Sequence, residues 1–349
     1  MGGDVSERPG QSARVGEKHR GVGDRVPPAL RFPNWRRSVA VTPSALAVTA
    51  AGIEFQNPVL LAAGTAAYGR ELARVIDLDA LGGLVTKAVS VERRHGARAP
   101  RVAEFEGGMI NAVGLANPGV EEVKAEHLPW LATNLRRARV LVNVVGNQVE
   151  EFATVVSMLD DSPAVSGYEL NVSCPNVRAG GLEFGADPKS LTDVVSRARK
   201  ATRRPIFVKL SPTLQDIGRS AQTAADAGAD GISVVNTLPG LLIDVDTRKP
   251  ALGFGTGGVS GPGLLPVGVL ATHKVAKAVR LPVIGVGGIS AATDIVQYVI
   301  AGASLVAIGT AAMQQPRLPE KLVAELERWC KEKGVTSLSD LRGSLQWEN

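Results

Sequence analysis

The segment Pro282-Val283-Ile284-Gly285-Val286-Gly287-Gly288-Ile289-Ser290 joins a β-branched run to a pair of glycines. β-Branched residues favour a strand, and adjacent glycines favour a tight turn at its end. From about residue 57 the same order recurs, with an apolar run, a turn rich in Gly, Pro or Asn, and a helical pattern. The runs occupy residues 58–63, 83–88, 140–145, 167–171, 205–210, 231–236, 282–286 and 305–308. This alternation predicts parallel strands with crossover helices, and eight strands are the number that closes a (β/α)₈ barrel.

A doubly wound open sheet is the rival architecture for such an alternation. That fold carries a G-x-G-x-x-G turn after its first strand, and the first run of this chain lacks one. Gly228 and Gly302 stand where two helices should stop, since glycine tolerates the left-handed conformation of a helix end. Helical patterns span residues 188–202, 214–227, 264–279, 291–301 and 319–333. We therefore predict an α/β protein with a TIM barrel.

The first forty residues differ in composition from the rest of the chain. They are rich in Gly, Arg, Pro and Ser and contain eight basic and four acidic residues, which leaves the remainder nearly neutral. They also lack the apolar core of a secretory signal. We expect residues 1–40 to form a disordered or irregular basic extension and residues 41–340 to form a single barrel domain. A nearly neutral barrel offers no surface for a nucleic acid.

The compartment follows from hydropathy and cysteine content. No apolar run approaches the roughly 18 residues that cross a membrane. Cys174 and Cys330 are the only cysteines, too few for a disulfide framework. A cytoplasmic location is therefore expected. The four histidines have no ligand spacing, so no metal site is expected.

Glycines end the last two predicted strands, as Gly287-Gly288 and as Gly309 before Thr310. Glycine lets backbone N–H groups approach an anion closely, and the N-terminus of the following helix adds its dipole. The loops after strands seven and eight of a barrel often hold a phosphate. A phosphate-bearing ligand is therefore predicted at this place.

The other strand ends carry polar residues, namely Lys87, Asn143, Asn171, Lys209 and Asn236. A single lysine could simply extend to solvent. Polar groups at five strand ends favour a fixed charge beside an electron-rich cofactor instead. A phosphate-tethered redox ring near Lys209 describes FMN. The long connections at 89–139 and 237–281 are expected to supply substrate contacts.

Three segments resemble the class 1 dihydroorotate dehydrogenases. Asn111-Ala112-Val113-Gly114-Leu115, followed by Asn117-Pro118-Gly119, resembles their substrate loop. Glu169-Leu170-Asn171-Val172-Ser173-Cys174-Pro175-Asn176 resembles their catalytic loop, and Asn236-Thr237 resembles the pair that closes on the substrate. The resemblance runs from about residue 46 to residue 333, and the Asn-Pro-Gly form is similar to the 1B branch.

The resemblance implies flavin-dependent oxidation of (S)-dihydroorotate to orotate in pyrimidine (UMP) biosynthesis. Cys174 would be the base that takes the C5 proton, while hydride passes from C6 to FMN. A thiol suits this role, because a modest shift from a pKa near 8.5 gives useful thiolate near neutral pH. FMN contacts are implied for Ala63, Lys87, Ala88, Asn143, Asn171, Lys209, Val235, Gly261, Gly287, Gly288, Gly309 and Thr310. Substrate contacts are implied for Lys87, Asn111, Ala112, Val113, Gly114, Leu115, Asn171, Asn236 and Thr237.

The chain departs from the family's pattern at one position: Ala63, before Gly64-Thr65, stands where many relatives have a serine. The 1B resemblance also implies a homodimer core with a separate iron–sulfur, FAD-containing subunit that passes electrons to NAD⁺. The alternatives are a fumarate-coupled class 1A enzyme, a pyrimidine reductase like that of dihydropyrimidine dehydrogenase, and a dihydrouridine synthase. From a different class, a non-catalytic phosphate-binding barrel also remains open.

Overall fold

The computed structural model describes residues 1–2, 44–173, 175–176 and 182–347. Within them, parallel strands close a barrel in the order β11-β12-β17-β18-β3-β4-β7-β8. These strands are β3 (Val59–Leu61), β4 (Gly83–Val85), β7 (Arg139–Val144), β8 (Gly167–Asn171), β11 (Ile206–Leu210), β12 (Gly231–Val234), β17 (Val283–Val286) and β18 (Leu305–Ile308). Each coincides with one predicted run, so the barrel prediction is confirmed. Apart from residues 1–2, the predicted extension lies outside the described residues.

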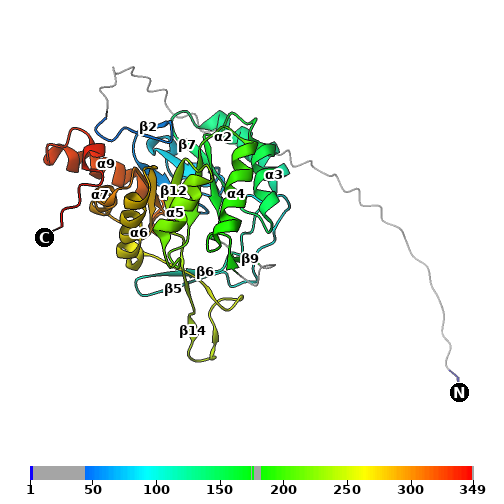
Figure 1. Cartoon of the computed structure of the whole chain (residues 1–349). Helices are drawn as coiled ribbons and strands as arrows, with labels where there is room; N and C mark the ends of the chain where they lie inside the picture. Colours follow the sequence, from blue (N-terminus) through cyan, green and yellow to red (C-terminus); the bar gives the residue numbers. More distant parts are fainter. Residues whose placement is uncertain (3–43, 174, 177–181, 348–349) are drawn as a thin grey trace, which may run out of the picture. The chain divides into compact units, whose positions relative to one another are not determined.

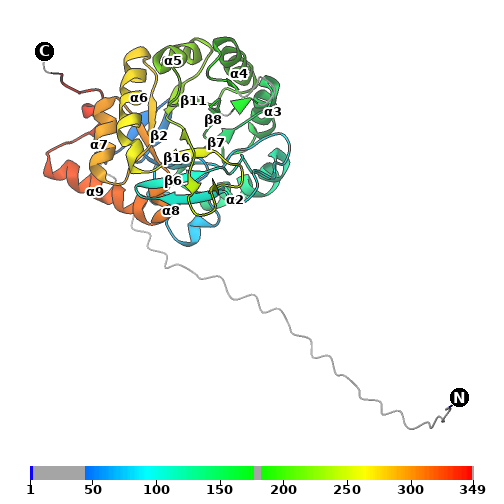
Figure 2. The same cartoon turned by 90° about the horizontal axis from the view of Figure 1, so that it is seen from below.

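Helices surround the strands as an outer ring (Figure 2). The longer ones are α3 (Val149–Leu159), α4 (Pro188–Ala201), α5 (Ile217–Asp226), α6 (Leu265–Ala278), α7 (Ala292–Ala301) and α9 (Leu318–Glu332). Shorter helical segments are Leu72–Arg74, Leu78–Ala80, α1 (Val120–Glu122), the π-helical turn Val123–His127, α2 (Leu128–Asn134), Pro262–Leu264, α8 (Thr310–Gln314) and Leu338–Leu341. All five predicted helices are present, whereas α3 was not singled out by the sequence pattern.

Local sequence explains where these helices begin and end. The Asp187 carboxylate accepts a 2.8 Å hydrogen bond from the Ser190 N–H and caps α4. Asp216 accepts a 3.0 Å bond from the Arg219 N–H and caps α5 in the same way. α7 ends at Ala301, and the next residue, Gly302, has a φ of 122°, which is open to glycine and strained for other residues.

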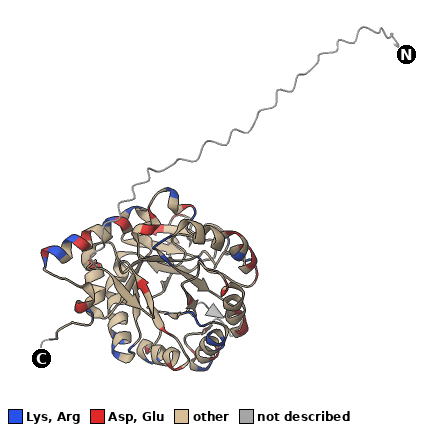
Figure 3. Ribbon diagram, turned by 90° about the horizontal axis from the view of Figure 1, so that it is seen from above, with Lys and Arg blue, Asp and Glu red and all other residues tan. Residues whose placement is uncertain are grey.

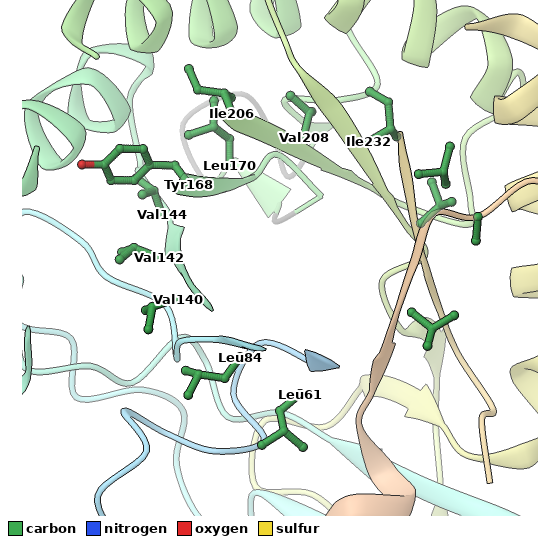
Figure 4. Packing of buried hydrophobic residues seen from close by; sticks show 14 of the residues in the cluster. Leu61, Leu84, Val140, Val142, Val144, Tyr168, Leu170, Ile206, Val208 and Ile232 are labelled. Carbon is green, nitrogen blue, oxygen red and sulfur yellow. The ribbon is translucent and has the colours of Figure 1, made fainter. Parts of the chain in front are cut away.

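Alternation along the strands sorts the apolar side chains into two cores. Figure 4 shows Val140, Val142 and Val144 on one side of β7, where they join the core between strands and helices. Leu141 lies on the other side of β7 and belongs to a smaller core inside the barrel. That inner core includes Phe55 from the hairpin of β1 (Val48–Ala50) and β2 (Ile53–Phe55). Apolar side chains therefore fill the end of the barrel where the strands begin.

A four-stranded antiparallel sheet lies at the other end of the barrel, where the strands finish (Figure 1). It consists of β5 (Val102–Phe105), β6 (Gly108–Asn111), β13 (Leu238–Gly240) and β16 (Gly257–Ser260). β6 comes from the connection at 89–139 and pairs with β16 from the connection at 237–281. A hairpin of β14 (Ile243–Asp244) and β15 (Lys249–Pro250) extends further from the barrel. The two long connections thus meet on the face where substrate contacts are predicted.

The outer surface of the helical ring carries both signs of charge, interspersed around the barrel (Figure 3). This distribution agrees with the nearly neutral composition of residues 41–349. Among the residues that the structure describes, no helix is long and apolar enough to cross a membrane.

Candidate active site

A cavity of about 220 Å³ lies where the barrel strands end, beneath the added sheet. Its walls come from the ends of β3, β11, β12, β17 and β18 and from β5, β6 and β16. The predicted residues that line it are Ala63, Asn111, Val113, Lys209, Val235, Asn236, Thr237, Gly261, Gly287, Gly288, Gly309 and Thr310. The cavity therefore brings together residues predicted for the cofactor and residues predicted for the substrate.

Gly287 and Gly288 turn the chain sharply after β17, with φ values of 124° and 71°. A Cβ atom on Gly288 would lie 2.3 Å from the backbone nitrogen of Leu265, so only glycine fits. Within the described part of the chain, no hydrogen bond is donated by the Gly288 N–H. The N–H groups of Thr310 and Ala311 open α8 and have no partner inside that helix. These backbone donors border the cavity and suit an anionic group.

Gly309 lies beside this group of donors, but its surroundings differ from those of Gly288. A Cβ atom on Gly309 would lie 3.7 Å from the Ala62 Cβ and 3.9 Å from the Thr65 Oγ1, which are ordinary contact distances. Both neighbours line the cavity. A longer side chain at Gly309 would therefore enter the cavity without disturbing the barrel.

Three hydroxyl-bearing residues of the cavity were missed by the sequence patterns, namely Thr65, Ser260 and Ser290. The Thr310 Oγ1 and the Ser260 Oγ are 2.8 Å apart. Ser290 lies two residues after Gly288, so its position could have been noticed. Ser260 comes from a long connection, and no local signal marks it.

A buried polar group extends the site into the barrel. The Asn143 Nδ2 donates a 2.7 Å hydrogen bond to the Glu169 Oε1, and the Lys209 Nζ lies 3.8 Å from the same oxygen. The three residues come from the neighbouring strands β7, β8 and β11 and are almost fully buried. Lys209 lines the cavity, whereas Asn143 and Glu169 are not among its lining residues. The sequence pattern gave Glu169 no role, although a charge at an inward strand position is a usable signal.

A chain of hydrogen bonds joins two predicted substrate residues. The Asn236 Nδ2 donates to the Ser173 Oγ over 2.7 Å, and the Ser173 Oγ donates to the Asn171 Oδ1 over 2.8 Å. Asn171 ends β8 and Asn236 follows β12. Ser173 therefore couples two amide side chains that the sequence assigned separately to the substrate.

Lys87 and Ala88 follow β4 and do not line the cavity. The Lys87 N–H donates to the Ala67 oxygen over 2.8 Å, and the Tyr68 hydroxyl donates to the Ala88 oxygen over 3.0 Å. Burial raises the pKa of Tyr68, so this hydroxyl keeps its proton as a donor. Both residues are held at the strand-end face of the barrel, and their predicted contacts stay predictions.

The predicted substrate loop is only partly at the cavity. Asn111 and Val113 line it, but the Asn111 Nδ2 donates to the Gly258 oxygen over 3.2 Å and so also fastens β6 to β16. The Ala112 N–H donates to the Arg101 oxygen over 2.8 Å. Gly114 and Leu115 do not line the cavity, and both have positive φ values, of 70° and 56°. These two residues shape the turn that carries the loop.

Cys174, the predicted base, lies outside the described residues. Two short strands that follow it in the chain, β9 (Pro175–Asn176) and β10 (Leu182–Glu183), pair in antiparallel fashion. The predicted role of Cys174 as the base therefore rests on the sequence motif alone. Among the residues that the structure does describe, no group of His, Cys, Asp or Glu could hold a metal ion.

The fold and cavity define a (β/α)₈ barrel with a binding cavity at the ends of its strands. Comparison with known proteins identifies which barrel family this is. The family model described as dihydroorotate dehydrogenase matches residues 45–329. The chain belongs to the dihydroorotate dehydrogenase family.

Individual relatives agree with the family match. The catalytic subunit of dihydroorotate dehydrogenase B (NAD⁺) from Pelobacter propionicus is 46% identical over 301 residues, which cover 86% of this chain and 98% of the relative. The corresponding subunit from Geobacter metallireducens is 44% identical over 301 residues, with the same coverage of both chains. A protein from Solibacter usitatus, provisionally named a fumarate-linked dihydroorotate dehydrogenase A, is 47% identical over 302 residues, 86% of this chain and 99% of the relative.

Proposed function

We propose that this chain is the catalytic subunit of a class 1B, NAD-linked dihydroorotate dehydrogenase, which oxidises dihydroorotate to orotate in pyrimidine biosynthesis. The observation that carries the proposal is the family match over residues 45–329, on a barrel whose strand ends form a cavity that Lys209, Asn236 and the Gly287-Gly288 turn help to line. The names of the Pelobacter and Geobacter relatives specify the NAD-linked catalytic subunit. The Asn117-Pro118-Gly119 segment favours the same branch over the fumarate-linked one.

Dihydroorotate dehydrogenases are flavin-dependent, and we infer that the flavin here is FMN. The backbone N–H groups at Gly288, Thr310 and Ala311 suit its phosphate, because they border the cavity and have no hydrogen-bond partner within the described residues. Lys209 contributes a positive charge to the lining. The Asn143 Oδ1 is buried and has no hydrogen-bond partner among the described residues, so it can accept from a ring N–H group. The residues present therefore fit FMN, which when bound accepts a hydride from the substrate.

The remaining proposed roles belong to side chains that hold the substrate. Dihydroorotate offers amide-like edges and a carboxylate, and an Asn side chain presents both a donor and an acceptor to such edges. Asn171 and Asn236, coupled through Ser173, read those edges in this proposal. Lys87 meets the negative charge of the substrate. Cys174 takes the C5 proton from the face opposite the flavin.

Electrons must then leave the subunit. The chain contains two cysteines, too few to hold an iron–sulfur cluster of its own. We propose that a separate subunit carrying an iron–sulfur cluster and FAD receives the electrons and passes them to NAD⁺, around a homodimer of this chain. The competing proposal is direct reduction of fumarate, and the name of the Solibacter relative motivates it.

An assay of electron acceptors tests this assignment. The chain is purified alone and with its candidate partner subunit, and dihydroorotate oxidation is measured with NAD⁺ and with fumarate. We expect NAD⁺ to be reduced only when the partner is present. Efficient NAD⁺ reduction by the isolated chain would rule out the partner, and a preference for fumarate would replace the 1B assignment with 1A.

A further inference from the structure

Glu169 is a buried carboxylate for which the proposed reaction has no use. It lies on β8 and is 1% exposed. Its neighbours Tyr168 and Leu170 pack in the core between strands and helices (Figure 4). Side chains alternate along a strand, so Glu169 points into the barrel. A charged side chain in this position is costly unless it is paired.

The partners of Glu169 are two residues that the FMN proposal uses. Its Oε1 accepts the 2.7 Å bond from the Asn143 Nδ2, and the Lys209 Nζ lies 3.8 Å away. The second distance is too long for a direct hydrogen bond, so it describes an ion pair. The side chains of Lys209 and Glu169 are 7% and 2% exposed, so water and salt screen this pair weakly.

Glu169 decides which end of the Asn143 amide faces the site. A carboxylate only accepts hydrogen bonds, so the NH₂ group of Asn143 must turn toward it. The Oδ1 is then left on the other side, buried and without a partner among the described residues. An unpaired buried carbonyl is unfavourable, which indicates that a donor from a ligand completes it.

Glu169 also changes the charge that Lys209 presents. Lys209 lines the cavity, and Glu169 pairs with it without being a lining residue itself. The negative charge partly offsets the ammonium, so a ligand in the cavity experiences less than one full positive charge. A reduced flavin is richer in electrons than an oxidised one, so this offset makes the flavin harder to reduce.

We propose that Glu169 is a positioning residue that sets the reactivity of the bound flavin, by orienting Asn143 and by offsetting the charge of Lys209. This inference rests on the proposed FMN function. Removing the negative charge of Glu169 leaves Lys209 without that partner, and this fixes the direction of the expected change. The flavin should then be reduced more readily and should bind anionic nucleophiles more tightly.

The test is titration of the flavin-loaded protein with sulfite, whose addition to oxidised flavin bleaches the visible absorbance. The Glu169→Gln substitution keeps the shape of the side chain, and its amide oxygen can still accept the hydrogen bond from the Asn143 Nδ2. For one buried charge at this range, the dissociation constant for sulfite should fall on the order of tenfold. The flavin midpoint potential, measured with reference dyes, should shift in the positive direction.

Two further variants separate charge from structure. Glu169→Asp keeps the negative charge, so its sulfite affinity should stay close to that of the wild type. This variant also decides the question if Glu169→Gln fails to fold, since a tenfold shift in Glu169→Asp would contradict a role based on charge. Asp230→Asn is the matched control, because it breaks the 2.7 Å ion pair with Arg199 near the start of β12, away from the cavity. It should lower stability and leave sulfite affinity unchanged.

The outcomes distinguish this inference from the proposed function. If the wild type binds FMN that dihydroorotate reduces, while Glu169→Gln retains wild-type sulfite affinity and potential, Glu169 is only structural and the inference fails alone. If the wild type binds no flavin, the proposed function and the inference fail together. A tighter sulfite complex in Glu169→Gln with unchanged values in the other two variants supports the inference.

Discussion

The amide of Asn236 donates a 2.7 Å hydrogen bond to the hydroxyl of Ser173, which donates in turn to Asn171. This contact ties the end of β12 to the segment that follows β8, 63 residues earlier in the chain. Ser173 is also the residue before Cys174. The contact therefore links the proposed substrate amides to the proposed base.

Replacement of Ser173 by alanine should weaken substrate binding. The Asn171 oxygen and the Asn236 amide would each lose a partner in a buried setting, which typically costs about 1–3 kcal/mol. We expect KM for dihydroorotate to rise about tenfold while kcat changes little. Steady-state kinetics measure this, and Ser196→Ala on α4 is the control. An unchanged KM would mean that the two amides do not need this bridge.

Gly309→Leu should give a folded protein without FMN. The position has room for a Cβ atom, but a longer side chain would fill space beside Ala62 and Thr65. The absorbance of bound flavin measures occupancy, and thermal unfolding should stay near that of the wild type. Gly309→Ala, with only one added carbon, should retain FMN. Full occupancy in Gly309→Leu would place the phosphate elsewhere.

Gly288→Ala should instead destabilise the fold. Its Cβ atom would lie 2.3 Å from the Leu265 nitrogen at a φ of 71°, so the backbone has to shift. Strain of this kind costs about 1–3 kcal/mol in the free energy of unfolding. Urea denaturation measures the loss. Gly263→Ala, where no atom lies within 4 Å of the added carbon, is the matched control. Equal stability of the two variants would contradict the steric argument.

The His127 ring should make stability depend on pH. It stacks on Tyr68 with centroids 4.2 Å apart. Burial, and then the nearby Arg70, lower its pKa from 6.5 in the folded state. Protonation thus favours the unfolded chain, so the contribution is complete above about pH 6.5 and is lost as pH falls through the lowered pKa.

Urea denaturation between pH 5 and pH 8 measures this dependence. Stability of the wild type should rise with pH across the lower part of that range, and His127→Gln should reduce the slope because its side chain does not titrate. An identical slope in both proteins would assign the pH dependence to other groups.

Cys174→Ala should retain FMN and bind orotate while losing most turnover. Removal of a general base typically costs about 10²–10⁴-fold in rate. Cys174→Ser should keep a little activity that rises with pH, because a hydroxyl is a much poorer base. Pre-steady-state reduction of the flavin measures the step directly. Wild-type rates in Cys174→Ala would show that another group takes the proton.

The barrel could be predicted from sequence because its signals are local. Each strand is a short apolar run with its own turn, and Gly287-Gly288 marks the end of β17 without reference to other segments. Ser260 could not be found in this way. It reaches the cavity because β16 pairs with β6, and the contact between Asn111 and Gly258 spans 147 residues of sequence.

Glu169 illustrates a second limit of sequence patterns. Alternation along β8 places its side chain inside the barrel, but its effect depends on Asn143 and Lys209 on neighbouring strands. Strand order in a closed barrel, with β8 between β7 and β11, supplies that information. The sequence pattern gave Glu169 no role, and its partners follow only from the strand order.

Anaerobic reduction of the bound flavin tests whether this chain oxidises dihydroorotate. The purified wild-type chain, loaded with FMN, is mixed with dihydroorotate in one experiment and with dihydrouracil in another, and the flavin absorbance is followed. Dihydroorotate should bleach the flavin rapidly, with orotate formed in equal amount, and dihydrouracil should cause little change. Bleaching by dihydrouracil alone, or by neither compound, would contradict it.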